Sequence, residues 1–130
     1  MNFPKELRYT KSHEWARREG EKVVCGITEY AQKEISDVVF VEVPKRGQAA
    51  EQAKAVAVVE SVKAAFDIYA PMSGKVSQVN ADLESRPELV NQDCYGQGWF
   101  FEIEASDPSE WDKLMTAEEY EKNIQNESVK

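Results

Sequence analysis

Six residues, Glu60-Ser61-Val62-Lys63-Ala64-Ala65, form the segment of the chain best suited to carrying chemistry. They join two short runs of strand-forming residues, at 55–59 and 66–70, and a join this short predicts a tight hairpin turn. Lys63 would then project from the tip of the hairpin, between small neighbours that leave the backbone accessible. A modifying enzyme can reach an amine in that position, and the amine can carry a long group outward.

The position of Lys63 narrows the chemistry that it can perform. The chain has eleven lysines, and most lysines at hairpin tips provide only solvated charge. A Schiff-base or general-base lysine needs a desolvated amine with a pKa well below about 10.4, and an exposed tip provides no such burial. Spacing alone therefore favours a solvated lysine, with covalent attachment of a carried group as the alternative.

The composition argues against several other classes of function. The net charge is −8, from 24 acidic and 16 basic residues, whereas binding of nucleic acid needs a concentrated basic face. Cys25 and Cys94 lie far apart, and His13 is the single histidine, so no metal site is predicted. No nucleophile–base pair or phosphate-binding glycine loop is evident, so no catalytic residue is predicted either.

The ends and the hydropathy of the chain bear on its location. No apolar run approaches the roughly 20 residues of a membrane span, so no membrane partner is expected. The opening residues, MNFPKELRYT, have neither the apolar core of a secretory signal nor the look of a transit peptide. We expect a cytoplasmic protein, or a trimmed mature form, which would lie in the mitochondrial matrix.

Short strands are the main elements that must position Lys63. The run 55–59 is continuously apolar, which predicts a strand covered on both faces. Val39, Val41 and Val43 alternate before Pro44, which predicts a half-buried strand. Further strands are predicted at 13–17 and 22–27, as a hairpin, and at 66–70 and 101–105.

Helix signals are concentrated near the end of the chain. Asp107 followed by Pro108 predicts a helix start, and Thr116 with Glu119 forms a second capping box. C-terminal helices are therefore expected at about 107–124, followed by a frayed tail at 125–130. Two shorter helical turns are predicted, at 30–35 after a capping Thr28 and at 85–88.

Ordered segments along most of the chain resemble the glycine cleavage system H-protein family. ESVKAA, around Lys63, looks like the lipoylation site of that family. The other similar segments are KSHEW at 11–15, GITEYAQ at 26–32, VVFVEVP at 38–44, DIYAPMSGKV at 67–76, PELVNQDCYGQGW at 87–99 and SDPSEWDKL at 106–114. They follow the family's order from about residue 7 to 120, which makes the resemblance far more specific than ESVKA alone.

The resemblance implies a fold and a covalent cofactor. The fold would be mainly β, a flattened sandwich or barrel of the lipoyl/biotinyl-carrier (hammerhead) type with short helices, including C-terminal ones. We expect a single domain over 1–130, with its core at about 7–120. Lipoic acid would be attached to Lys63, with Glu60, Ser61, Val62 and Ala64 recognised by the lipoate-attaching enzymes.

The implied role is that of a non-catalytic, monomeric carrier in glycine catabolism. The arm would receive an aminomethyl group from glycine decarboxylase, a pyridoxal-phosphate enzyme. An aminomethyltransferase would pass the methylene to tetrahydrofolate, and dihydrolipoyl dehydrogenase would restore the disulfide. The reactive chemistry would belong to the cofactor and the partners, while this chain supplies attachment, reach and shelter.

Shelter of the loaded arm would involve three polar residues. The aminomethyl group carries an amine that is cationic at neutral pH, and carboxylate and hydroxyl oxygens stabilise such a cation. Ser12, Glu14 and Asp67 are the candidates, since Ser12 and Glu14 lie in KSHEW and Asp67 follows the arm's turn. His13 is interpreted as a structural histidine beside Trp15.

The chain departs from the family pattern at three places. Phe66 replaces a small polar residue, Cys94 replaces a proline, and AEQAK at 50–54 lacks a glycine, which affects the expected loop geometry near the arm.

Biotinyl sites typically place the lysine between methionines, unlike Val62 and Ala64 here. The alternatives that stay open are a lipoyl-relay protein that donates lipoyl groups to 2-oxo-acid dehydrogenases and an unmodified binding module of the same fold.

Overall fold

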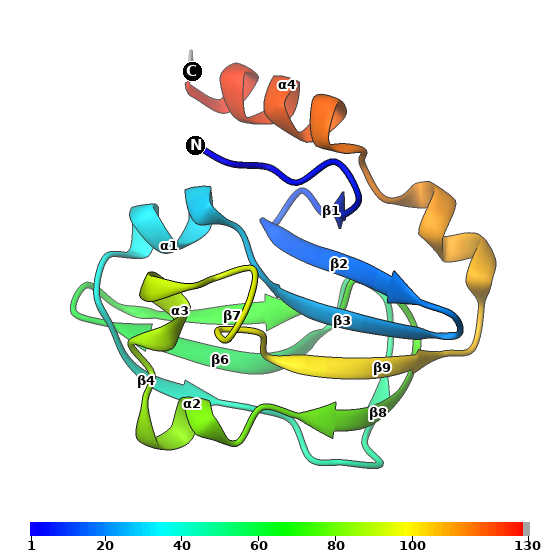
Figure 1. Ribbon diagram of the computed structural model, residues 1–130, viewed down its shortest axis with the longest axis horizontal. Coiled ribbons are helices and arrows are strands. Elements are labelled where there is room, and N and C mark those ends of the chain that lie inside the picture. Colours follow the sequence, from blue (N-terminus) through cyan, green and yellow to red (C-terminus); the bar gives the residue numbers. More distant parts are fainter. Residues whose placement is uncertain (129–130) are drawn as a thin grey trace.

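The structure is a computed structural model that describes residues 1–128, and it consists mainly of antiparallel strands in two sheets (Figure 1). The larger sheet has the strand order β1-β2-β3-β9-β8-β5, and the smaller sheet has the order β4-β6-β7. The strands are β1 (Arg8–Tyr9), β2 (Glu14–Glu19), β3 (Lys22–Ile27), β4 (Val38–Glu42), β5 (Ala49–Ala50), β6 (Ala55–Ser61), β7 (Ala65–Tyr69), β8 (Gly74–Val79) and β9 (Phe101–Ala105).

Short helices connect and cover the strands. They are α1 (Glu29–Ile35), α2 (Asp82–Ser85), α3 (Leu89–Gln92), the 3₁₀ helix η1 (Pro108–Lys113) and α4 (Ala117–Ser128). Thr28 caps α1 as predicted, because its hydroxyl accepts a hydrogen bond from Ala31 N at 3.1 Å. None of the described helices is long and apolar enough to cross a membrane.

The main core lies where the inner faces of the two sheets meet. Val23, Ile103 and Val76 contribute from the larger sheet, and Val41 and Val59 contribute from the smaller one; all five are 1 % exposed or less. Two sheets that bury facing apolar side chains in this way form a sandwich. The predicted fold class, mainly β with short helices, is therefore confirmed.

A second cluster lies on the other side of the larger sheet, where the N-terminal segment and α4 run together (Figure 1). Tyr9 and Tyr120 are fully buried there, and their rings stack with centroids 4.8 Å apart. Trp15 packs in the same cluster, and Ile124 of α4 completes it. Because this cluster covers β1 and β2, it fixes the loop of residues 10–13 that leads into β2.

The ends of the C-terminal helices differ partly from the prediction. The capping box of Thr116 and Glu119 is confirmed, by hydrogen bonds of 2.9 and 3.3 Å. The helix continues to Ser128, so the predicted frayed tail was wrong for residues 125–128, and residues 129–130 lie outside the described part. The helical turn predicted at 85–88 falls between two short helices: α2 ends at Ser85, and Leu89 N and Val90 N donate to Arg86 O and Pro87 O in the turn that leads into α3.

The smaller sheet corrects two further predictions. The strand at 55–59 is not covered on both faces, because Ala57 and Val59 are buried while Val56 and Val58 are only partly so. In β4 a bulge shifts the register between Val38 and Phe40, so that the buried residues are Val38 and Val41 rather than the alternating valines. The outer face of this sheet is open.

A close approach between β2 and β3 gives a test of the fold. Gly26 pairs with Trp15, and a Cβ atom at Gly26 would lie 2.7 Å from the indole ring. Gly26→Ala should therefore lower the free energy of unfolding by about 1–3 kcal/mol, as overpacking of a core does. Chemical denaturation measures this, with Gly20→Asn as the control, because Gly20 has open space around it and a φ of 67° that Asn tolerates. Equal stability of the two variants would contradict the packing argument.

Candidate functional site

Lys63 lies at the tip of the β6–β7 hairpin, as predicted, with Val62 and Ala64 exposed on either side. Ser61 closes the turn through two hydrogen bonds: its backbone N–H donates to Ala64 O at 2.9 Å, and its hydroxyl accepts from Lys63 N at 3.1 Å. The Lys63 ammonium donates to the carbonyl of Glu34 at 3.0 Å. The backbone of the tip is therefore held in place while the side chain is exposed.

The residues on either side of the tip are held by hydrogen bonds and strand pairing to the neighbouring strands. Val62 N donates to Asp37 O at 3.0 Å, just before β4 begins. Glu60 is exposed and lies opposite Phe40 of β4 and Ala65 of β7. The sequence-predicted recognition residues thus surround Lys63 on one short, ordered hairpin.

A cavity of about 320 Å³ lies beside the hairpin, between α1 and β7. We call it the α1–β7 groove; its lining residues are Ser12, His13, Ile27, Tyr30, Ala31, Glu34, Ile35, Val59, Phe66, Asp67 and Ile68. Most of these side chains are apolar. Since Glu34 both lines the groove and accepts the hydrogen bond from the Lys63 ammonium, the lysine lies at the mouth of the groove.

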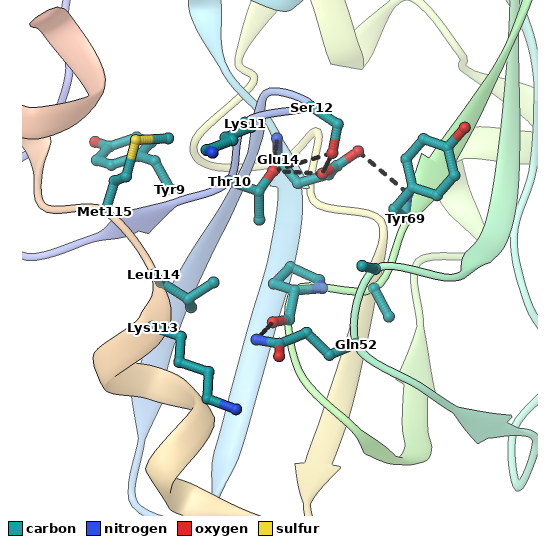
Figure 2. Close-up of a pocket in the computed structure, with 13 residues that line it drawn as sticks. Tyr9, Thr10, Lys11, Ser12, Glu14, Gln52, Tyr69, Lys113, Leu114 and Met115 are labelled. Carbon is teal, nitrogen blue, oxygen red and sulfur yellow. Dashed lines mark hydrogen bonds between the residues drawn. The ribbon is translucent and has the colours of Figure 1, made fainter. Parts of the chain in front are cut away.

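A second cavity, of about 290 Å³, lies further along β7 (Figure 2). It is lined by Tyr9, Thr10, Lys11, Ser12, Glu14, Gln52, Ala53, Tyr69, Ala70, Pro71, Lys113, Leu114 and Met115. Ser12 lines both cavities, so they meet at this residue. The first cavity follows Phe66, Asp67 and Ile68 of β7, and the second follows the next residues, from Tyr69 to Pro71.

The Glu14 carboxylate is buried between the two sheets, with only 1 % of the residue exposed. One oxygen accepts hydrogen bonds from the hydroxyls of Thr10 and Ser12, each at 2.5 Å, and the other accepts from Tyr69 N at 3.1 Å (Figure 2). Burial raises the pKa of Glu14 above its usual range, although these three donors and the nearby His13 oppose the rise. A nearby cation would therefore stabilise the charged form of this buried carboxylate.

The three predicted arm-pocket residues lie in two adjoining cavities, and no single cavity is lined by all three. Ser12 and Glu14 are hydrogen-bonded, whereas Asp67 lines only the α1–β7 groove. Thr10 was missed by the sequence analysis, although hydroxyl residues two and four positions before Glu14 could have indicated it. Tyr69 was also missed, because it acts through its backbone N–H, which no side-chain pattern reveals.

His13 has a structural environment, but its contacts differ from the prediction. Its Nδ1 lies 2.8 Å from the Tyr120 hydroxyl, its Nε2 lies 3.3 Å from Glu127, and its ring packs against Tyr30. Trp15 points elsewhere and donates to Cys94 O at 3.0 Å. The residue therefore connects α4 to the wall of the α1–β7 groove.

Two of the three departures from the family pattern, Phe66 and Cys94, have different surroundings. Phe66 lines the α1–β7 groove and is 37 % exposed, so it narrows the groove beside the turn that carries Lys63. Cys94 lies buried, on the far side of β2 from the groove, where its carbonyl accepts the Trp15 indole N–H. Burial raises the pKa of the Cys94 thiol to about 12, which makes it an unreactive packing residue.

Comparisons with known proteins give consistent matches over most of the chain. The family model described as "Glycine cleavage H-protein" matches residues 7–127. A glycine cleavage system H protein of Thermus thermophilus is 52 % identical over 128 residues, covering 98 % of this chain and 100 % of that protein. A probable glycine cleavage system H protein of Aeropyrum pernix is 50 % identical over 120 residues, covering 92 % and 84 %.

A solved structure also matches the fold. The crystal structure of a glycine cleavage system H protein from Mycobacterium marinum superposes with a TM-score of 0.87 at 31 % sequence identity. The match covers 95 % of this chain and 99 % of the other.

The raised pKa of Glu14 predicts a pH dependence of stability. The Glu14 carboxyl binds its proton more tightly in the native state than in the unfolded chain. The contribution of this group to the unfolding free energy should therefore fall as pH rises from about 4.3 through the raised pKa. Glu14→Gln should remove that contribution, so the stability difference between wild type and variant should change with pH. Denaturant titrations across this range measure the difference, with the exposed Glu104→Gln as the control. A difference independent of pH would contradict the assignment.

Proposed function

Since the chain belongs to the glycine cleavage H-protein family, we propose that it acts as one lipoyl-carrier domain, with the lipoyl group on Lys63. The observation that carries this proposal is the place of the Lys63 ammonium, exposed on an ordered hairpin tip at the mouth of the α1–β7 groove. Glu60, Ser61, Val62 and Ala64 present the lysine to the attaching enzyme.

The residues around Lys63 suit a lipoyl group. The amine needs exposure for acylation, and its hydrogen bond to a single carbonyl is easily exchanged for water. A flexible, mainly apolar arm needs an apolar resting surface, which Ile27, Ala31 and Ile35 provide within the groove. When attached, the lipoyl group supplies a disulfide that accepts the aminomethyl group of decarboxylated glycine and is later restored by oxidation.

The chain's own contribution is shelter for the cation delivered on the arm. Asp67 lies along the groove, and Ser12 and Glu14 lie where the groove meets the second cavity. An ammonium near the Glu14 carboxylate offsets part of the cost of burying that charge, so the carboxylate favours the charged amine. The apolar walls exclude water, which would otherwise release the carried group.

The carrier is non-catalytic in this proposal, and its partners perform the reactions. Glycine decarboxylase loads the arm, the aminomethyltransferase unloads it to tetrahydrofolate, and dihydrolipoyl dehydrogenase reoxidises it. A tethered arm raises the effective concentration of its cargo at each partner, so docking need not be tight. The net charge of −8 suits weak, exchangeable contacts with several partners.

The attachment site is tested by intact mass spectrometry on protein from lipoate-sufficient cells. We expect wild type to gain the mass of one lipoyl group and Lys63→Arg to gain none, because the guanidinium of arginine is not acylated. Lys54→Arg, on an exposed lysine of the same sheet region, serves as the control and should be modified like wild type. An unmodified wild-type protein would refute the proposal.

The shelter is tested by the lifetime of the aminomethyl group on the loaded carrier. Loss of one charge-assisted contact of about 1.5–3 kcal/mol corresponds to roughly a tenfold or greater change, so Glu14→Gln or Asp67→Asn should shorten the half-life by about that factor. Mass spectrometry of the loaded protein follows the decay, with Glu104→Gln as the matched control on an exposed strand position. Half-lives equal to wild type in both variants would remove these residues from the proposal.

A further inference from the structure

Exposed apolar side chains gather beside Lys63, on the side of the hairpin away from the α1–β7 groove. Among residues 1–128, the large hydrophobic residues that are exposed are Met1, Val39, Phe40, Val62 and Phe66. Phe66 lines the groove and Met1 is terminal. The other three, Val39, Phe40 and Val62, are 47–65 % exposed and form what we call the tip patch.

The β-bulge in β4 creates the tip patch. Val38 pairs with Ser61 and Phe40 pairs with Glu60, so Val39 is the extra residue in the ladder, and both Val39 and Phe40 end up exposed. Val62 adjoins them because its N–H donates to Asp37 O, one residue before β4. A bulge that turns two apolar residues outward adds no burial to the core, and a contiguous exposed apolar patch is typical of an interaction surface.

Carboxylates surround the tip patch. Asp37 precedes β4, and Glu42 lies two residues beyond Phe40, on the same face of the strand. Glu60 lies directly opposite Phe40 on β6. All three side chains belong to exposed residues. The complementary surface on a partner would therefore have an apolar socket with a basic rim.

We propose that the tip patch docks the enzyme that attaches the lipoyl group, with Phe40 as the main apolar anchor. The inference rests on the proposed lipoylation of Lys63. In that step the lysine Nζ, after losing a proton, forms an amide bond to the acyl carbon of an activated lipoyl donor, while the bond from that carbon to the leaving group breaks. The donor is an acyl-adenylate or an acyl thioester supplied by the enzyme.

The reach of Lys63 selects this partner over the others. Attachment occurs at Nζ itself, one side chain away from the hairpin backbone, so the attaching enzyme must approach the tip closely, where Val62 adjoins Val39 and Phe40. Enzymes that use the finished arm meet its far end and can stay further from the tip. Docking on the outer face also leaves the α1–β7 groove free, since Phe66 and the groove lie on the other side of the hairpin.

The test measures lipoylation of the apo-protein by a purified lipoate–protein ligase with lipoic acid and ATP, using mass spectrometry for initial rates. The double variant Val39→Ser with Phe40→Ser should lower kcat/KM by about tenfold or more, as loss of an interface hot spot does. Val79→Ser, a half-exposed valine of the other sheet, should react like wild type. Thermal unfolding confirms that each variant is folded.

A second variant keeps the proposal testable if the double variant does not fold. Glu42→Lys should lower kcat/KM several-fold at low salt, and the effect should shrink as ionic strength rises, because rim charges act mainly on the association rate. Glu104→Lys, exposed on β9, is its control and should have no effect.

Three results would overturn the inference. The first is wild-type rates in both the double variant and Glu42→Lys. The second is normal attachment combined with slow aminomethyl loading, which would assign the patch to a partner that uses the finished arm. The third is a wild-type dimer that the double variant converts to a monomer, which would assign the patch to a second copy of the chain. A wild type that is never acylated at Lys63 would instead refute the proposed function, and the inference with it.

Discussion

The buried carboxylate of Glu14 joins the two sheets, and the candidate site depends on this contact. A carboxylate this deeply buried must have donors, and they come from both sides: the Thr10 and Ser12 hydroxyls before β2, and the Tyr69 N–H at the end of β7. The Tyr69 bond satisfies part of the free edge of β7, the strand that leads away from Lys63. The α1–β7 groove and the second cavity meet where this contact is made.

The hairpin that carries Lys63 separates two functions in space. Its inner side faces the α1–β7 groove, where we propose that an arm and its cation are sheltered, and its outer side carries the tip patch with its acidic rim. The Ser61 turn and the Asp37–Val62 hydrogen bond order the backbone, so the freedom of motion is confined to the Lys63 side chain. An ordered tip with a flexible arm limits the conformational entropy lost at each docking event, while the arm retains its reach.

Local patterns predicted the local features, and long-range packing decided the rest. Two short strand-forming runs and a six-residue join were enough to predict the hairpin around Lys63, and the Thr28 and Thr116 caps followed from neighbouring residues. The half-open face of β6 and the bulge at Val39 could not be predicted, because they depend on which strands flank β6 and how they pair. The Glu14–Tyr69 contact joins residues 55 positions apart through a backbone N–H, so no side-chain pattern indicates it. The sequence likewise placed Ser12, Glu14 and Asp67 in one pocket, whereas two adjoining cavities divide them.

The most direct test of the account is an NMR titration of the Tyr69 amide in the lipoylated protein, with and without the aminomethyl group. This N–H donates to Glu14, so its chemical shift reports the protonation of that carboxylate. We predict a midpoint above the usual carboxyl value of about 4.3 in the unloaded protein, and a lower midpoint in the loaded one, because the delivered cation stabilises the charged form. The same midpoint in both states would show that the cation does not reach Glu14 and would contradict the account.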